Sequence, residues 1–423
     1  MQIFAILFIT KAYKSWTGFY DELVWGALWL HKATGKVPYL TKATLAYKNN
    51  HLDRDISLFS WDNKVPGLHV LLSEITGRPN YKNTLKLFCR DKMPGGEAKR
   101  TPLGMVYLGD WGALRYAAAA AGLCYVAADM KIDPDANRDF AKSQLDYILG
   151  DTGRSFVVGF GVNPPTRVYH KESFCPPAPE QCGSFTGIPN RHLLEGALVG
   201  GPDEFDRYED DPWKQQQSSV ALDYNAVFTF MLLGQIDNDL FPSRRPTPLK
   251  PGRPLKTTGG VSQNAVHDGP AFGEESGPIF SESGGSGKEH DYLKALAKTL
   301  EFYDAQRAGI IPTEYNVPWR QSATLQDEKD DADLRGGFFD AAGTMKYTFP
   351  LAYSLTLICW SVLEFELSYD YHIDHLKDII KHGINWLMEA NSDTNKVYAL
   401  VGNQTYEDSF WGRPSDMKVG YSN

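Results

Sequence analysis

The sequence predicts an all-α fold, and three observations support this prediction. Apolar residues recur at helical spacing in several separate segments. The sequence contains no alternation of strand and helix patterns, and it contains no series of short alternating strands. Helices joined by long loops are therefore the expected architecture, and functional side chains are expected on the loops.

The N-terminal part of the chain contains helical patterns separated by turn clusters. These patterns lie within residues 23–30, 111–126 and 140–149. Trp residues that fall on helical stripes of the chain are predicted to fill the core, and they are Trp25, Trp29, Trp111 and Trp360.

A segment dense in Pro, Gly and Ser separates this part from the rest of the chain. Residues 242–288 carry no hydrophobic periodicity and are predicted to form a flexible linker between residues 1–241 and residues 289–423. Beyond the linker, residues 351–363 are apolar on nearly all sides and predict a buried helix. Two further helical stripes are Leu293, Leu296, Leu300 and Tyr303, and Leu376, Ile379, Ile380, Ile384 and Leu387.

Composition excludes two classes of partner. The chain has 423 residues with 43 Lys and Arg against 52 Asp and Glu, a formal net charge of −9. Nucleic-acid binding needs a concentration of basic residues that no segment provides. No apolar run approaches the roughly 18 residues that cross a bilayer. The sequence therefore predicts no nucleic-acid or membrane partner, and it leaves the oligomeric state open.

The cysteines predict one local disulfide. Cys175 and Cys182 flank a Pro-rich loop and are the expected pair, whereas Cys89, Cys124 and Cys359 lie in apolar surroundings and are expected to be buried free thiols. A disulfide favours secretion. Residues 1–10 have the apolar character of a signal peptide but lack a basic start and a cleavage motif, so they match only part of the pattern of a signal peptide.

Two groups of motifs carry a resemblance to one family. The first group lies before the linker, at residues 15–23, 141–147, 156–167, 196–203 and 220–226. The second group lies after it, at residues 300–307, 317–320, 336–341 and 411–414. Together they resemble glycoside hydrolase family 9, whose members are inverting endo-β-1,4-glucanases built on an (α/α)6 barrel. The resemblance implies that barrel, a β-1,4-glucan or oligosaccharide partner, and no cofactor.

The order of the two groups is inverted relative to the family. The family's C-terminal half comes first, so the barrel is expected to be permuted or incomplete. One explanation is a circular permutant, since a linker of this length spans about 35 to 40 Å and lets both halves meet. The other is a slice across the junction of a tandem array. The slice, or an incomplete gene model, is favoured because roughly 70 residues that should join residues 411–414 to the Trp16 region are absent.

The resemblance places the catalytic positions on residues that cannot perform the catalysis. An inverting glycosidase needs a carboxylic acid to protonate the leaving oxygen and a carboxylate base to activate water. The family's base is the second Asp of an Asp-Ala-Gly-Asp motif, where this chain has Gly343; Asp340 retains the first Asp, which in the family helps to hold the water. The family's acid is a Glu, where this chain has Ser219.

Sugar contacts also depart from the family. Its Pro-His-His-Arg is here residues 168–171, and its Asp-His is Glu407-Asp408. A Lys cannot repeat the two-pronged contact of an Arg. The candidate substrate-binding residues are Arg167, Tyr169, His170, Lys171, Asp210, Trp319, Asp408 and Trp411. No metal site is predicted, because His372, His375 and His382 lack a supporting carboxylate pattern and are expected on a solvated helix face.

The sequence thus predicts a family 9 scaffold with impaired or lost hydrolysis. One alternative is rescue by Glu204, Glu209 or Asp211 acting as a substitute acid. Another is a non-catalytic glucan-binding protein, and a third is a non-functional fragment of a tandem cellulase.

Overall fold

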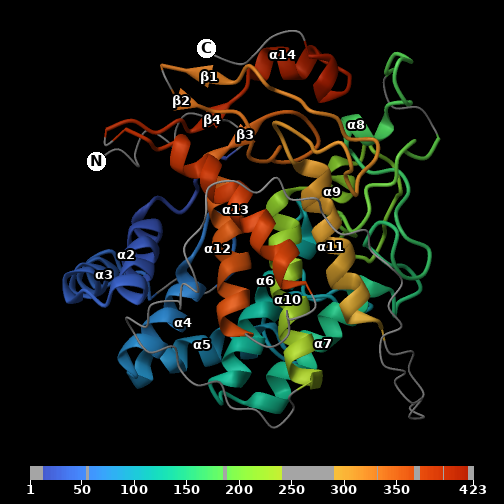
Figure 1. Cartoon of the computed structure of the whole chain (residues 1–423). Helices are drawn as coiled ribbons and strands as arrows, with labels where there is room; N and C mark the ends of the chain where they lie inside the picture. The colour runs from blue at the N-terminus through green and yellow to red at the C-terminus, as the bar shows by residue number, and fades with distance from the viewer. Residues whose placement is uncertain are drawn as a thin grey trace.

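The computed structural model describes residues 13–53, 57–183, 188–240, 290–330, 332–365, 372–393 and 395–417. Helices dominate these residues, which confirms the predicted all-α class (Figure 1). The possible signal segment and the predicted linker lie outside the described residues. None of the described helices is long and apolar enough to cross a membrane.

The helices before the linker form most of the lower part of the molecule in Figure 1. They are α2 (Tyr20–Thr34), α3 (Val37–Asn49), α4 (Val65–Thr76), α5 (Pro79–Lys92), α6 (Ala113–Asp129), α7 (Pro134–Leu149), α8 (Lys171–Phe174), α9 (Gln215–Ser218) and α10 (Leu222–Leu240). The helices after it are α11 (Tyr292–Gln306), α12 (Thr348–Glu364), α13 (Ile373–Glu389), α14 (Gln404–Ser409) and the short 3₁₀ helix Pro414–Asp416.

Four short strands lie near one end of the central helices (Figure 1). They are β1 (Glu328–Lys329), β2 (Ala332–Asp333), β3 (Lys346–Tyr347) and β4 (Leu400–Val401). β1 pairs antiparallel with β2, and β3 pairs antiparallel with β4 with Lys346 opposite Val401. The second pair fixes the loop before β3 beside the loop that leads into α14.

All the helical patterns recognised in the sequence form helices: they lie in α2, α6, α7, α11, α12 and α13. The sequence pattern did not single out α3, α4, α5 or α10. The central helix α10 is buried at every residue from Leu222 to Ile236, so it has no polar face and no amphipathic stripe.

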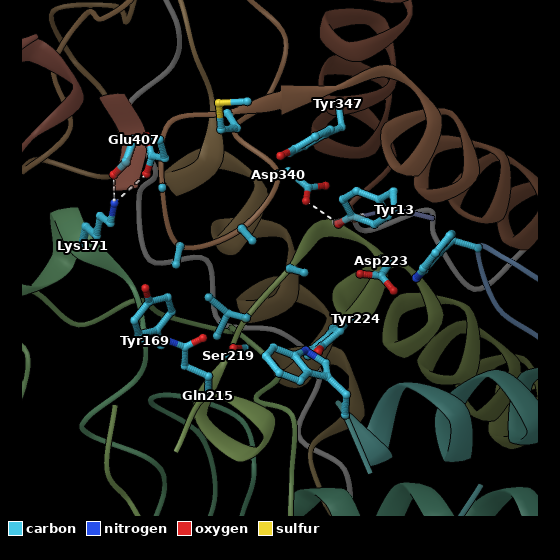
Figure 2. A pocket seen from close by; sticks show the side chains of 18 of the residues that line it. Tyr13, Tyr169, Lys171, Gln215, Ser219, Asp223, Tyr224, Asp340, Tyr347 and Glu407 are labelled. Carbon is cyan, nitrogen blue, oxygen red and sulfur yellow. Dashed lines mark hydrogen bonds and ion pairs between the residues drawn. The ribbon is translucent and has the colours of Figure 1, made fainter. Parts of the chain in front are cut away.

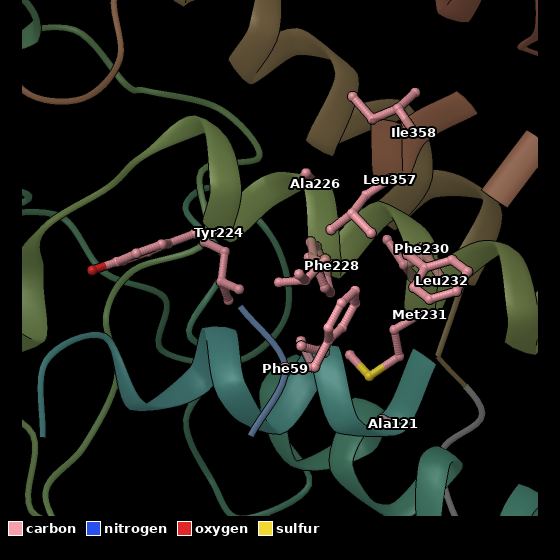
Figure 3. Packing of buried hydrophobic residues seen from close by; sticks show 14 of the residues in the cluster. Phe59, Ala121, Tyr224, Ala226, Phe228, Phe230, Met231, Leu232, Leu357 and Ile358 are labelled. Carbon is pink, nitrogen blue, oxygen red and sulfur yellow. The ribbon is translucent and has the colours of Figure 1, made fainter. Parts of the chain in front are cut away.

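One hydrophobic core joins the two parts of the chain. α10 packs against α6 and α7 from the first part and against α11 and α12 from the second (Figure 3). Small residues of α6 allow the close approach, because a Cβ placed on Gly122 would lie 2.5 Å from Phe230 Cδ1 on α10. The ends of α10 and of its neighbours are therefore held in fixed positions.

The cysteine prediction is half right. Cys175 and Cys182 form the predicted disulfide. Cys89 and Cys124 also form a disulfide, so their assignment as free thiols is wrong. Apolar surroundings did not exclude the bond, because the packing of α5 on α6 brings the two Cα atoms to 5.8 Å, which is within disulfide range. Cys359 on α12 is a free thiol as predicted, but it is half-buried and not fully buried.

Three of the four Trp residues that were predicted to fill the core lie in it or pack against it, and Trp111 does not. Trp25 and Trp360 are buried in the core, and Trp29 packs against it. Trp111 is 47% exposed. It precedes α6 instead of lying within it, because Gly112 turns the chain in the left-handed region with a φ of 66°.

Candidate active site

A cavity of about 530 Å³ opens where the two parts of the chain meet (Figure 2). Its walls come from the start of α10, the loop around α9, the loop before β3, and α14. The lining residues are Tyr13, Trp61, Trp111, Arg115, Tyr169, Lys171, Gln215, Ser219, Val220, Ala221, Asp223, Tyr224, Asp340, Ala341, Ala342, Gly343, Met345, Tyr347, Gln404, Glu407 and Asp408. Aromatic rings and carboxylates therefore share one cavity.

Asp340 lies in this cavity, as its motif predicts. Its backbone N–H donates to the carbonyl of Met345, and its own carbonyl accepts from Leu222 at the start of α10. The carboxylate accepts a hydrogen bond from the Tyr13 hydroxyl through Oδ2, while buried Oδ1 has no hydrogen-bond partner among the described residues (Figure 2). Burial raises the pKa of Asp340 to about 7, with Asp223 adding to the rise and the Tyr13 hydrogen bond opposing it.

Asp223 is a second buried carboxylate in the same cavity. It lies in the first turn of α10, and Arg115 Nη1 donates to its Oδ2 at 3.1 Å. Burial raises the pKa of Asp223, and the charge of Arg115 opposes the rise. Two buried carboxyl groups that resist ionisation are typical of a functional site.

Ser219 also lines the cavity, at the position that the resemblance assigns to the acid. It ends α9, where its N–H donates to the carbonyl of Gln215 at 3.0 Å and its carbonyl accepts from Gly200 at 2.9 Å. Its hydroxyl is a weak donor of protons at neutral pH, so the position offers polarity without acid chemistry.

Gly343 lines the cavity at the position assigned to the base, and it faces Glu407. A Cβ placed on Gly343 would lie 2.7 Å from Glu407 Cδ and still closer to Oε1. Lys171 Nζ donates to Glu407 Oε1 at 2.8 Å, to the Glu407 carbonyl at 2.6 Å and to the Phe410 carbonyl at 3.1 Å (Figure 2). All three ammonium protons of Lys171 are thus used within the protein.

His170 does not line the cavity, which corrects the predicted groove position. The backbone at residues 169 and 170 is extended, so the two side chains point in opposite directions and only Tyr169 faces the cavity. His170 Nδ1 accepts from the N–H of Ser173 at 3.1 Å, and its Nε2 lies 2.9 Å from Gln306 Oε1. Burial lowers the pKa of His170 to about 3, so the ring is neutral.

Trp319 and Trp411 are likewise outside the cavity wall. Trp319 stacks on His192, with ring centroids 5.4 Å apart and planes 10° apart. Trp411 lies 6.3 Å from Trp213 and 5.6 Å from the Lys171 ammonium, measured from its ring centroid. Neither ring therefore lines the cavity that contains Asp340, and a role of either ring in sugar binding stays a prediction.

Of the remaining predicted contacts, Asp408 lines the cavity and accepts a hydrogen bond from Gln404 Nε2 at 2.7 Å. Arg167 and Asp210 lie outside the cavity wall. Asp210 accepts from the N–H and hydroxyl of Thr166 at 2.9 and 2.7 Å and from the N–H of Arg167 at 3.1 Å. Asp210 therefore holds two loops together.

Several wall residues were not predicted from the sequence. Trp111 had been assigned to the core, and Tyr13 is 327 positions from the Asp340 carboxylate that it contacts. The position of Trp111 directly before the start of a helix could have indicated that its side chain is exposed. No local sequence pattern identifies Tyr13 as a wall residue. The other unpredicted wall residues include Trp61, Arg115, Tyr224 and Tyr347.

Within the part of the chain that the structure describes, no cluster of His, Cys, Asp and Glu could hold a metal ion. His375 Nε2 lies 2.8 Å from Asp304 Oδ2, and His382 Nε2 lies 2.8 Å from the Gly337 carbonyl. These two rings are half-buried and contact separate partners, so the helix face that carries them is only partly solvated.

Comparisons with known proteins agree on one family. The sequence model of "Glycosyl hydrolase family 9" matches residues 7–232 and 292–422. Endoglucanase A of Bacillus pumilus is 39% identical over 231 residues, which cover 51% of this chain and 34% of that protein. Endoglucanase B of Cellulomonas fimi is 39% identical over 240 residues, which cover 52% of this chain and 22% of that protein.

Two solved structures are similar to part of this chain. An endoglucanase from the termite Nasutitermes takasagoensis is 43% identical with a TM-score of 0.49, over 51% of this chain and 50% of that chain. The endoglucanase CelQ of Clostridium thermocellum, solved with cellotriose, is 34% identical with a TM-score of 0.49, over 59% of this chain and 43% of that chain. This chain thus spans half or less of each of these relatives. Because the family's sequence model matches well over half of the chain, on both sides of the Pro-rich segment, the chain belongs to glycoside hydrolase family 9.

Proposed function

We propose that the cavity binds β-1,4-glucan or its oligosaccharides and that hydrolysis of these glucans is impaired or lost. The single observation that carries the proposal is the pairing of Ser219 and Gly343 in the walls of a cavity that keeps Asp340. The cavity belongs to a scaffold whose relatives are endoglucanases, and CelQ was solved with a cello-oligosaccharide.

The walls suit a sugar chain. Trp111, which is 47% exposed, offers an apolar ring, and the largely buried rings of Trp61 and Tyr347 also line the wall; pyranose rings present C–H groups that pack against aromatic rings. Gln215, Gln404 and Asp408 offer polar groups around them for the sugar hydroxyls. The volume of about 530 Å³ accommodates a few sugar units.

Cleavage lacks both the family's general acid, at the position of Ser219, and its general base, at the position of Gly343. Loss of a general acid or of a general base typically lowers the rate by about 10²- to 10⁴-fold. A serine hydroxyl does not donate a proton at neutral pH as a carboxylic acid does. Intact cello-oligosaccharides have poor leaving groups and depend on that proton, so their cleavage suffers most.

Rescue by another acid has no support in the cavity. Glu204 forms an ion pair with Lys99, and Glu209 lies 3.3 Å from Lys214 at the surface. Asp211 Oδ1 accepts from the N–H of Trp213 at 3.0 Å. None of the three carboxylates lines the cavity that contains Asp340.

Two further proposals concern the whole chain. We propose that residues 1–241 and 289–423 correspond to the C-terminal and N-terminal halves of a family 9 module. The order of the motifs along the sequence carries this proposal, and the family match lies on both sides of residues 242–288. We also propose secretion, because two disulfides suit an oxidising compartment. N-terminal sequencing of protein recovered from the medium of an expressing host tests secretion.

Titration of the protein with cellohexaose in a calorimeter, followed by chromatography of the same sample after a long incubation, tests the proposed function. Binding with the sugar intact is expected. The Trp111→Ala variant should bind cellohexaose at least about tenfold more weakly, because it loses an aromatic contact that the sugar would bury. The matched control is Trp16→Ala, since Trp16 is 78% exposed and does not line the cavity. Rapid shortening of cellohexaose contradicts impaired hydrolysis, and absence of binding contradicts the glucan site.

A further inference from the structure

A carboxylate already occupies the space into which a side chain at position 343 would extend. The notional Cβ of Gly343 lies 2.7 Å from Glu407 Cδ and closer to Oε1, so the two positions compete for one place in the wall. The backbone of Gly343 is outside the left-handed region, so no special conformation requires a glycine there. Its lack of a side chain leaves room for Glu407.

Glu407 is held in this place from both sides. Oε2 accepts from the N–H of Thr344 at 3.2 Å and from the Thr344 hydroxyl. Oε1 accepts only from Lys171 Nζ, at 2.8 Å, among the described residues. A carboxylate oxygen has two acceptor sites, so Oε1 keeps one for a water molecule in the cavity. The residue is 6% exposed and its orientation is fixed by these contacts.

We infer that Glu407 is the general base of this cavity, acting from α14 in place of a carboxylate at position 343. The inference rests on the proposed function, since it assumes that a glucan occupies the cavity. With Ser219 at the acid position, the site then has a base but lacks the carboxylic acid that the family uses to protonate the leaving oxygen. Such a site cleaves a glycoside whose leaving group departs without a proton, and it leaves ordinary cello-oligosaccharides intact.

β-Cellobiosyl fluoride is a substrate of this kind. The water oxygen attacks the anomeric carbon, and the carbon–fluorine bond breaks with its electron pair leaving on fluoride. The water proton passes to Glu407 Oε1. The products are fluoride and cellobiose, which is released as the α-anomer because attack occurs opposite the leaving group.

The first test measures fluoride release from β-cellobiosyl fluoride and cellohexaose affinity in parallel. The wild-type chain should release fluoride faster than buffer does, with α-cellobiose as the first product. Glu407→Gln should lower kcat by about 10²- to 10⁴-fold while cellohexaose affinity stays unchanged. Glu314→Gln, on an exposed loop outside the cavity, is the matched control and should keep the wild-type rate.

Azide tests whether Glu407 acts on the water molecule or only shapes the site. Azide needs no base, so it should restore fluoride release in Glu407→Ala and form α-cellobiosyl azide. A purely structural role of Glu407 predicts no rescue. The double variant Gly343→Asp/Glu407→Ala should also recover activity, because removal of the Glu407 side chain frees the space for the aspartate.

The outcomes separate this inference from the proposed function. Cellohexaose binding without fluoride release overturns the inference alone. Fluoride release that survives Glu407→Gln but is lost in Asp340→Asn overturns it in favour of Asp340. Absence of cellohexaose binding overturns the proposed function and the inference together.

Discussion

At the scale of single residues, the cavity contains carboxyl groups that the fold keeps from ionising easily. Asp340 and Asp223 are both buried, and burial raises the pKa of each. Their ionised forms cost stability that the surrounding core must offset. Functional sites commonly contain such groups, so stability at these positions is expected to depend on pH.

Replacing Asp340 by Asn should stabilise the protein at high pH. The pKa of Asp340 rises from 3.8 to about 7 on folding, so the folded chain binds more protons than the unfolded chain between these values. Stability therefore falls as the pH rises through this range, and the loss is complete above it. Asp340→Asn should raise the free energy of unfolding by about 1 to 3 kcal/mol at pH 8.

Urea denaturation of both proteins at pH 8, 6 and 4 measures this effect. The difference should shrink as the pH falls and should be smallest at pH 4, where Asp340 is protonated in the folded chain and only partly ionised in the unfolded chain. A constant difference at every pH would mean that ionisation of Asp340 carries no cost.

A buried ion pair connects α8 to the loop before β1. Glu172 and Arg320 are 5% and 4% exposed, and Arg320 also donates to the Arg307 carbonyl. Burial lowers the pKa of Arg320 to about 9. Glu172→Gln removes the compensating charge and should destabilise the protein by about 3 to 5 kcal/mol.

The matched control is Glu209→Gln, since Glu209 pairs with Lys214 at the surface with 66% of its side chain exposed. This change should cost under about 1 kcal/mol. Thermal unfolding at one pH measures both variants. Equal shifts in Tm would show that the buried pair contributes no more than the exposed one.

At the scale of elements, the packing of α6 on α10 depends on small residues. The run Ala117–Ala121 is almost fully buried, and Gly122 follows it directly beneath Phe230. Helix propensity alone favours Ala over Gly, so a local rule misjudges this position. The close contact of two helices decides the residue instead.

Gly122→Ala should therefore destabilise the protein although it improves helix propensity. The new Cβ would lie 2.5 Å from Phe230 Cδ1, and relieving this overlap costs about 1 to 3 kcal/mol. The control is Gly26→Ala in α2, where a Cβ meets nothing within 4 Å. That change should stabilise the protein by about 0.4 to 1 kcal/mol. Denaturant unfolding measures both, and equal signs would refute the packing argument.

At the scale of the whole molecule, the two parts of the chain depend on each other. Asn225 Nδ2 donates to Thr299 Oγ1 at 2.7 Å, and the Tyr303 hydroxyl donates to the Leu222 carbonyl at 2.9 Å. The Lys171–Glu407 pair also joins the two parts. Both disulfides lie within the first part, so the association between the described parts rests on packing, hydrogen bonds and buried ion pairs.

Cutting the chain between residues 242 and 288 should leave the two parts together. A protease site placed in this segment and cleaved in the folded protein should yield fragments that elute as one species and still bind cellohexaose. Residues 289–423 expressed alone should not fold, because α11 and α12 lose the contact with α10. Separation of the fragments in native buffer would contradict a shared core.

The sequence determined several features by itself. Helical spacing of apolar residues predicted α2, α6, α7, α11 and α13, and a segment that is apolar on nearly all sides predicted α12, because both patterns lie in neighbouring residues of the sequence. The motifs around Asp340, Ser219 and Gly343 carried the family resemblance, and all three residues lie in one cavity. Cys175 and Cys182, which flank a short loop, also paired as expected.

Only the tertiary structure decided which distant residues meet. Glu407 fills the space beside Gly343, Tyr13 reaches Asp340, and Cys89 bonds to Cys124. His170 turned into the core because its extended neighbour Tyr169 takes the side that faces the cavity. Such contacts depend on how helices and loops that are far apart in the sequence pack against each other. This packing leaves no periodic pattern in the sequence near either residue of a contact.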